Sequence, residues 1–165
     1  MVEVPLRNGM VALVDDEDAP RIMEHRWSAN RIGRIWYAIR RVGTSAPGKN
    51  ECKTILMHRE ILGATERSLV DHANRDGLDN RRANLRLANR SENAANMVAH
   101  RDNRSGFKGV FWNTSKGKWE PRIYVRGKAI WLGRYSDKEE AARVYDDAAR
   151  REFGEFARPN KTGGT

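Results

Sequence analysis

Polar and apolar residues alternate strictly between Lys118 and Arg126, and this pattern restricts the fold more than any other feature. Alternation with a period of two is typical of a strand that is buried on one face only. With Gly117 and Gly127 at the turns, the pattern predicts three strands at 107–113, 118–126 and 128–134. One face of this strand set would carry Lys118, Glu120, Arg122, Tyr124 and Arg126, and the other Trp119, Pro121, Ile123 and Val125.

A helix that follows these strands would cover their apolar face. Ser136 is predicted to begin it, with Glu139 in the capping-box position. Four alanines and one tyrosine share one face, and the alanines would let the helix lie close to the sheet. These residues are Ala141, Ala142, Tyr145, Ala148 and Ala149. The C-terminal part is therefore predicted to be a three-stranded antiparallel sheet packed on one α-helix, an α+β arrangement.

The first hundred residues show a mixed pattern of short elements. Val11, Leu13 and Val14 suggest a strand, after which Asp15 to Asp18 would cap a helix carrying Ile22, Met23 and Trp27. Residues 36–41 and 52–59 are expected to form strands on either side of a turn-prone loop, 43–50. Residues 69–97 are expected to form a strand, a long Gly/Asp/Asn loop, a short strand at 85–87 and a helix capped at Asn89 or Ser91.

The positive charge of the chain is concentrated rather than spread. The net charge is +9, and residues 101–135 hold nine Lys and Arg against Asp102 and Glu120, whereas residues 136–165 hold six against seven acidic residues. A solvated basic face would explain such a stretch. A surface for a polyphosphate explains it as well, because clustered cations release DNA counterions.

Composition excludes several classes of protein. Cys52 is the single cysteine, so intramolecular disulfides are excluded and no structural zinc site is expected. No apolar run approaches the roughly 18 residues of a membrane span. The first ten residues lack a signal-peptide pattern, so the expected location is the cytoplasm of a bacterial or phage-infected cell.

Asp71 and His72 are the adjacent residues that most suggest catalysis. Hydrolysis of a phosphodiester needs a metal ion to polarise the phosphate and a base to activate water. A carboxylate beside an imidazole can supply both functions, but adjacent strand residues share one site only where the strand ends or bends. The loop 73–83 begins directly after them, and Asn84 and Asn93 are the remaining polar candidates.

The surrounding pattern resembles the ββα-metal motif of phage HNH homing endonucleases, in the variant whose final His is Asn. The resemblance is carried by Asp71-His72, by Gly77-Leu78-Asp79-Asn80 with Asn84-Leu85-Arg86, and by Glu92-Asn93. It implies that Asp71 and Asn93 bind one divalent ion, Mg²⁺ or alternatively Mn²⁺. It implies further that His72 is the general base and that Asn84 orients the imidazole. Ala73 and Arg75 depart from the usual pattern and put the loop detail in doubt.

Other readings of these residues stay open. Asp71, Asn84 and Asn93 could simply tie down a loop, as Asx residues often do. His58 has apolar neighbours and is expected to be a buried, hydrogen-bonded histidine rather than a ligand, whereas His25 and His100 are expected to be incidental. One group of basic residues could contact DNA phosphates near the cleaved bond. A solvated charged face would explain the same residues about equally well. These are Arg81, Arg82 and Arg86.

Residues 105–160 resemble the APETALA2-type DNA-binding domain. The matching segments are 105–110, Lys118-Trp119, 130–135, 139–146 and 153–160. The family lays the exposed face of its sheet in the major groove. The resemblance implies DNA contacts from Lys108, Phe111, Asn113, Arg122, Tyr124 and Trp131, and strand parity adds Arg126. The apolar face toward the helix would carry Trp119, Ile123, Val125, Ile130 and Leu132. Ordinary apolar contact is the alternative for Trp131.

Together these patterns predict a metal-dependent HNH endonuclease with a C-terminal DNA reader. The expected divisions are an N-terminal α+β portion (1–50), an HNH module (51–97), a basic linker (98–104), the APETALA2-type domain (105–160) and a flexible tail (161–165). The partner would be double-stranded DNA, with no membrane, and the protein would be a monomer or weak dimer. A non-catalytic DNA-binding regulator and an RNA-binding or ribosome-associated protein are the alternatives.

Overall fold

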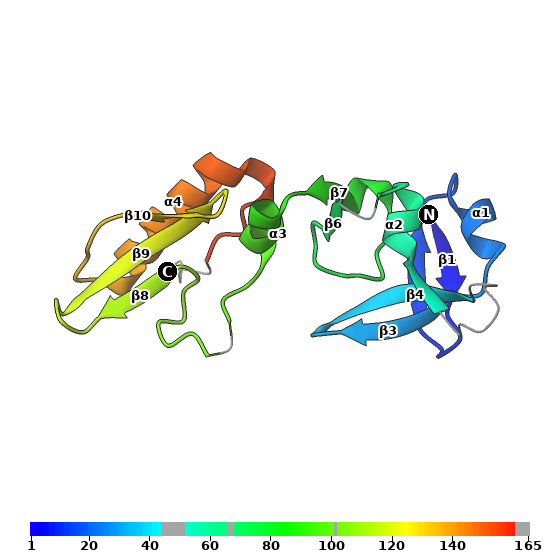
Figure 1. The fold of residues 1–165 in the computed structure, drawn as a ribbon, viewed down its shortest axis with the longest axis horizontal. Coiled ribbons are helices and arrows are strands. Elements are labelled where there is room, and N and C mark those ends of the chain that lie inside the picture. The colour runs from blue at the N-terminus through cyan, green and yellow to red at the C-terminus, as the bar shows by residue number, and fades with distance from the viewer. Residues whose placement is uncertain (44–51, 66–67, 101, 161–165) are drawn as a thin grey trace. The chain divides into compact units, whose positions relative to one another are not determined.

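The computed structural model describes residues 1–43, 52–65, 68–100 and 102–160. They belong to two compact units, Met1–Ala88 and Asn89–Thr165 (Figure 1). Both units combine small antiparallel sheets with helices, which confirms the expected mixed class. The division after Ala88 falls inside the expected HNH module and not in the linker 98–104. Among the described residues, no helix is long and apolar enough to cross a membrane.

The first unit contains two two-stranded sheets, β1-β2 and β6-β7, and one three-stranded sheet of order β3-β4-β5. Short helical segments separate them. In chain order the elements are β1 (Val2–Pro5), β2 (Val11–Val14), α1 (Ala19–Met23), β3 (Ser28–Ile32), β4 (Ile35–Gly43), β5 (Cys52–Leu56), α2 (Met57–Ile61), β6 (Leu69–His72), the 3₁₀ turn η1 (Arg82–Asn84) and β7 (Leu85–Ala88).

The beginning of the chain forms the strand and helix that were predicted, but the cap differs. Asp18 occupies the N-cap of α1 without a capping hydrogen bond, because its carboxylate pairs with Arg21 at 3.0 Å and Arg82 at 2.7 Å. Trp27 lies beyond the end of α1 and is almost fully buried, with its Nε1 donating to the Ile22 carbonyl at 2.8 Å. The aspartates therefore connect distant segments instead of capping the helix.

The strand expected over 52–59 ends early. Met57 begins α2 and is fully buried, so the apolar run 55–57 continues from a strand into a helix and stays in the core of the first unit. β3 was not predicted; it pairs with β4 through a turn at Gly33. The turn-prone loop 43–50 lies almost wholly outside the described residues.

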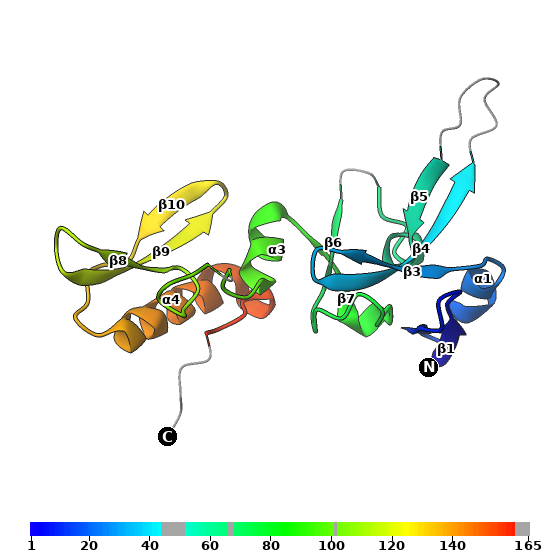
Figure 2. The ribbon, with the colours of Figure 1, turned by 90° about the horizontal axis from the view of Figure 1, so that it is seen from below.

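The second unit contains the predicted three-stranded sheet, in the order β10-β9-β8, with a long helix on one face (Figure 2). The strands are shorter than expected. The elements are α3 (Arg90–Asn96), β8 (Val110–Asn113), β9 (Lys118–Val125), β10 (Lys128–Trp131), α4 (Lys138–Phe153) and the 3₁₀ turn η2 (Gly154–Phe156).

The alanine-rich face of α4 packs on the sheet as predicted. Ala141, Ala142 and Tyr145 are buried together with Ile123 of β9. The cap was misplaced by one residue, because Asp137 accepts from the Glu140 backbone N–H at 2.6 Å. Ile130 was wrongly expected in the core. It is 41% exposed, because β10 is an edge strand and α4 packs mainly against β9 and β8.

Helix α3 belongs to the second unit because its buried end joins that core. Asn89 and Glu92 form a capping box, which decides between the two predicted caps. Ala95 is buried against the core of the second unit. The Lys108 ammonium donates to the carbonyls of Ala95 and Met97 at 2.6 and 3.0 Å and so holds the C-terminal end of α3.

Substitution of Gly109 tests the contact between α4 and the segment before β8. The residue has a φ of +75°, and a Cβ there would overlap the Tyr145 ring. We expect Gly109→Ala to lose about 1–2 kcal/mol from the left-handed backbone and about 1–3 kcal/mol more from overpacking. Gly106→Ala is the control, since its φ is +79° and nothing lies within 4 Å.

Hydrogen exchange of the α4 amides would measure both losses within this unit. If the two variants lose equal protection, the close approach of Gly109 to Tyr145 is not a constraint on the fold.

Candidate functional site

Asp71 and His72 end strand β6, and both are buried. In the pairing with β7, Asp71 lies opposite Arg86 and His72 opposite Leu85. Adjacent strand residues point to opposite faces. The chain leaves the strand directly after His72, where the Ala73 N–H donates to the Asn84 carbonyl at 2.9 Å. The strand end that the Asp-His pair requires is therefore present.

The loop 73–83 is held by side chains that bond to its own backbone. Asn84 Oδ1 accepts from the Asn74 N–H at 2.9 Å, and Asn84 Nδ2 donates to the Asp79 carbonyl at 2.7 Å. The Asn74 side chain also bonds Asp79 at 2.8 Å. Asn84 thus ties the two ends of the loop together, as the alternative reading of the sequence proposed. A direct contribution of Asn84 to imidazole orientation stays a prediction.

Asn80 is the side chain whose oxygen faces the His72 ring. Its Oδ1 lies 3.4 Å from His72 Nε2, and its Nδ2 donates to the Leu78 carbonyl at 3.0 Å. Strand β2 fixes this segment, because Leu13 donates to Leu78 and accepts from Asn80, both at 2.8 Å. Sequence reasoning assigned no role to Asn80, although an Asn after a Gly-Leu-Asp turn was a signal of local side-chain bonding.

Two further rings surround His72. The His58 ring centroid lies 4.9 Å from that of His72, and the Tyr37 centroid lies 5.8 Å from it. His58 is buried, as predicted, but the predicted hydrogen bond is missing. Its Nδ1 has no partner among the residues that the structure describes. The loop passes so close to this cluster that a Cβ on Gly77 would overlap the Trp36 carbonyl and the Tyr37 ring.

Burial favours the neutral form of both imidazoles. It lowers the pKa of His72, while the contact with Asn80 and the charge of Asp71 act in the opposite direction. It lowers the pKa of His58 further, to about 3, assisted by the neighbouring His72 and Arg59. A neutral imidazole can accept a proton, which a general base must do.

The donor set near Asp71 fits a hard cation with few protein ligands. Asp71 Oδ2 accepts from Arg86 Nη2 at 2.7 Å. Within the described residues, no cluster of three His, Cys, Asp or Glu side chains forms a possible metal site. Mg²⁺ commonly binds through one or two carboxylates and completes its shell with waters and substrate phosphates. One aspartate, with waters and phosphate oxygens at the other positions, is compatible with that arrangement.

The basic residues predicted near the cut are engaged by carboxylates. Arg81 pairs with Asp79 at 2.7 Å, Arg82 with Asp18 at 2.7 Å, and Arg86 with Asp71. Arg81 and Arg82 are still 41% and 45% exposed and Arg86 is 15% exposed, so phosphate contact by these residues stays a prediction. Asn93 lies on α3, in the second unit, so its place in a metal site stays a prediction from the resemblance.

The sheet of the second unit presents an open face opposite α4. Tyr124 of β9 is 60% exposed, Trp131 of β10 is 53% exposed and Phe111 of β8 is 48% exposed. Arg122 lies directly opposite Trp131 in the register of the strands. We call this surface, formed by Phe111, Asn113, Glu120, Arg122, Tyr124, Trp131 and Arg134, the open sheet face.

A buried carboxylate organises the open sheet face. Glu120 accepts from Arg134 Nε at 2.9 Å, from Arg122 Nη2 at 2.7 Å and from Asn113 Nδ2 at 2.8 Å. These three donors, Arg134 first, lower the pKa of Glu120 to about 2. Arg134 also lies over the Trp131 ring, 5.3 Å from its centroid. The sequence analysis missed Arg134; a carboxylate within a basic strand face was the signal that it needs partners.

Two residues predicted to contact DNA lie outside the strands of the sheet. The Lys108 ammonium contacts backbone carbonyls on α3 and, at 2.8 Å, that of Arg158. Arg126 follows the last residue of β9 with a φ of +50°. The alternation of a strand therefore does not extend to Arg126, and the parity argument for it was wrong.

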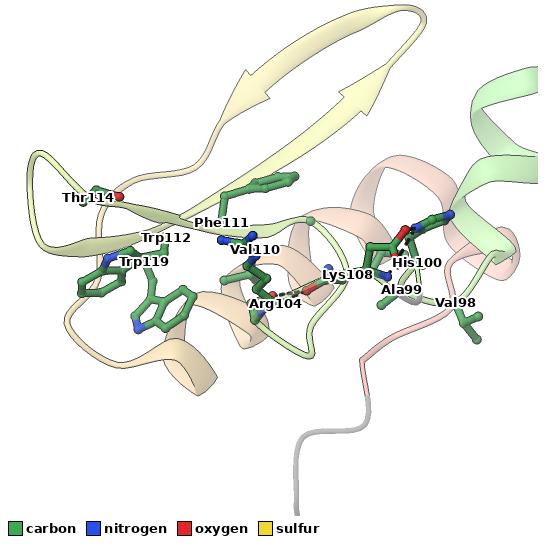
Figure 3. A pocket seen from close by; sticks show the side chains of 14 residues that line it. Val98, Ala99, His100, Arg104, Lys108, Val110, Phe111, Trp112, Thr114 and Trp119 are labelled. Carbon is green, nitrogen blue, oxygen red and sulfur yellow. Dashed lines mark hydrogen bonds and ion pairs between the residues drawn. The ribbon is translucent and has the colours of Figure 1, made fainter.

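A cavity of about 600 Å³ lies beside β8 (Figure 3). Trp112 and Trp119 line it with ring centroids 4.9 Å apart, and Phe111 projects from the opposite side of the strand. The segment around Val98 and His100 forms another wall. The tryptophans thus lie on the side of the strand away from the open sheet face.

An HNH endonuclease family model matches residues 66–95, which include Asp71, His72, Asn84 and Asn93. An uncharacterized HNH endonuclease of Acanthamoeba polyphaga mimivirus is 26% identical over 154 residues, which cover 93% of this chain and 76% of that protein. Protein 3.8 of Escherichia phage T7 is 34% identical over 90 residues, which cover 54% of this chain and 73% of that protein.

The C-terminal part is similar to plant proteins. An AP2/ERF and B3 domain-containing protein of Oryza sativa subsp. japonica is 44% identical over 59 residues, or 36% of this chain. This chain spans only 16% of that plant protein's length. The matched family segment, 66–95, extends across the division between the two units after Ala88. The chain belongs to the HNH endonuclease family, and its C-terminal part is similar to plant AP2/ERF domain-containing proteins.

Proposed function

We propose that this protein hydrolyses DNA phosphodiester bonds in a metal-dependent reaction. The observation that carries the proposal is the placement of a buried, neutral His72 beside Asp71 at the end of β6. Asp71 would bind a divalent ion, Mg²⁺ or Mn²⁺, with Asn93 as the second ligand that the resemblance implies. The ion would supply Lewis-acid stabilisation of the phosphate charge.

His72 would take the proton from the attacking water. Its ring is confined by His58 and Tyr37, and Asn80 Oδ1 lies against its Nε2. Such confinement holds the base in one orientation, and orientation contributes to catalysis because a misplaced base cannot reach the reacting water. Arg86 holds the Asp71 carboxylate in the absence of substrate and would have to share it when an ion binds.

The open sheet face would bring the protein to DNA. Glu120 positions the guanidinium groups of Arg122 and Arg134, and each group keeps further N–H donors for a base edge or a phosphate. Trp131 adds an exposed ring beside them. Strands are one of the known means of entering the major groove. Lys108 and the carboxylate-paired Arg81, Arg82 and Arg86 are not part of this proposed contact set.

A DNA-binding regulator without catalysis is the second candidate, favoured by the ion pair that Arg86 makes with Asp71. Plasmid cleavage separates the two. We expect purified protein to convert supercoiled plasmid into nicked circles with Mg²⁺ or Mn²⁺. Excess EDTA should stop the reaction, and added Mg²⁺ should restore it. Cleavage that continues in excess chelator would contradict the metal mechanism, and DNA binding without any cleavage would favour the regulator.

Replacement of the proposed base separates catalysis from binding. His72→Ala should lower the cleavage rate by about 10²- to 10⁴-fold, which is the usual contribution of general base catalysis. DNA affinity should change less than twofold, since the base acts in the transition state. His100→Ala, at an exposed ring in the second unit, is the control and should cut at the parent rate. If His72→Ala does so as well, another residue is the base.

Substitutions on opposite sides of the second unit test the proposed reading surface. Arg122→Ala and Trp131→Ala should weaken binding to duplex DNA, and Arg122→Ala should also reduce sequence preference. A bidentate guanine contact discriminates by about 1–3 kcal/mol. Arg150→Ala, on the exposed side of α4, should leave affinity within twofold. Fluorescence anisotropy with DNA of varied sequence would measure this, and a loss confined to Arg150→Ala would assign DNA to the helix.

A further inference from the structure

The first unit contains a hollow lined by arginines, away from His72. Its volume is about 350 Å³, and it lies among the loop after β1, strand β3 and strand β4. Its polar wall is formed by Arg7, Arg26, Ser28, Asn30, Arg40 and Arg41. We call it the arginine hollow. No residue of the HNH motif contributes to it.

Backbone and side-chain bonds shape this hollow. The Arg7 N–H donates to the Trp27 carbonyl at 2.9 Å. The next residue, Asn8, accepts from the Ala29 N–H at 3.1 Å and donates to the Ala29 carbonyl at 3.2 Å. The loop after β1 is thereby fastened along the start of β3, so Arg7 and Arg26 are held on the same wall.

Three of the four arginines that line the arginine hollow have no carboxylate partner among the described residues. Residues 21–43 hold six arginines and one acidic residue, Glu24. Arg40 is neutralised by Glu60 at 3.0 Å and lies over the Trp27 ring. Across the described part of the chain, no ion pair joins a carboxylate to Arg7, Arg26 or Arg41. Arg21, Arg40, Arg81, Arg82 and Arg86 of this unit are paired with carboxylates, whereas the three cations of the hollow are available to an anionic partner.

The position of the hollow relates it to the candidate active site within the same unit. Tyr37, Ile39 and Arg41 alternate onto one face of β4. Tyr37 contacts the His72 ring, and Arg41 lines the hollow. Four residues of strand span about 13 Å, a length equal to roughly four base pairs at 3.4 Å each. An anionic polymer that reaches His72 can therefore also reach the arginine hollow.

We propose that the arginine hollow binds the phosphate backbone of duplex DNA a few base pairs from the cut. This inference rests on the proposed function, since it takes DNA to be the substrate at His72. The hollow offers three cations and no aromatic surface for stacking bases, which favours sequence-independent backbone contact. It gives the N-terminal portion of the chain a role in holding the substrate.

The test measures binding of a 30-base-pair duplex to the full chain in EDTA as salt is varied. Each phosphate contact contributes about −0.9 to the slope of log affinity against log salt. The triple variant Arg7→Gln/Arg26→Gln/Arg41→Gln should flatten the slope by about 2–3. Its affinity at low salt should fall at least tenfold. The control Arg143→Gln/Arg150→Gln/Arg151→Gln removes the same charge from exposed α4 positions and should change the slope by less than about 1.

A variant with lysine at positions 7, 26 and 41 keeps the charge and should retain most of the parent slope. Equal slopes in the hollow and α4 variants would overturn the inference. A lysine variant whose slope flattens as much as that of the glutamine variant would overturn it too. Since EDTA prevents cutting, this result does not depend on catalysis. If the protein never cuts DNA but the slopes differ as expected, the proposed function is refuted and the binding role of the hollow stands. If the protein cuts DNA but the slopes do not differ, only the binding role of the hollow is refuted.

Discussion

The first unit depends on the pairing of Leu13 with the loop 73–83. Two backbone hydrogen bonds of 2.8 Å connect Leu13 to Leu78 and Asn80, segments more than sixty residues apart in the sequence. This pairing presents Asn80 to His72 and brings Gly77 against Tyr37. The candidate active site therefore requires β2 as much as the motif itself. Leu13, which lies outside the HNH motif, thus helps to fix the conformation of the loop 73–83.

Ion pairs between aspartates and arginines also surround the loop 73–83 in the first unit. Asp18 holds Arg21 and Arg82, Asp79 holds Arg81, and Asp71 holds Arg86. These partly buried pairs neutralise the arginines near the loop. Arg7, Arg26 and Arg41 have no such partner among the described residues and face solvent. In the second unit, the buried Glu120 likewise pairs with two arginines, Arg122 and Arg134, on the open sheet face. In both units the paired guanidinium groups stay partly exposed, except that of Arg86, which is 15% exposed.

Local periodicity predicted the second unit well, since a three-stranded sheet and its helix are defined by alternation and by small residues at helical spacing. Ile130 was misassigned because periodicity identifies a face but not where the covering helix ends. In the first unit, β3 and α2 escaped prediction because tertiary burial of Trp27 and Met57 decides them. The Asp-His pair was placed correctly at a strand end, whereas the carboxylate partners of Arg81 and Arg82 could not be inferred from spacing. Asp18 and Arg82 meet across 64 residues.

Within the described residues, Nδ1 of His58 has no hydrogen-bond partner, and this bears on the balance between the stability of the protein and its function. A buried polar atom without a hydrogen bond costs about 1–3 kcal/mol, a sizeable share of the 5–15 kcal/mol that typically separates folded from unfolded chains. In a protein optimised for thermal endurance alone, an apolar side chain would occupy this position. The chain instead keeps this unsatisfied atom in contact with the imidazole of His72, the base of the proposed reaction, where the stability of the fold and the proposed chemistry make opposing demands on one residue.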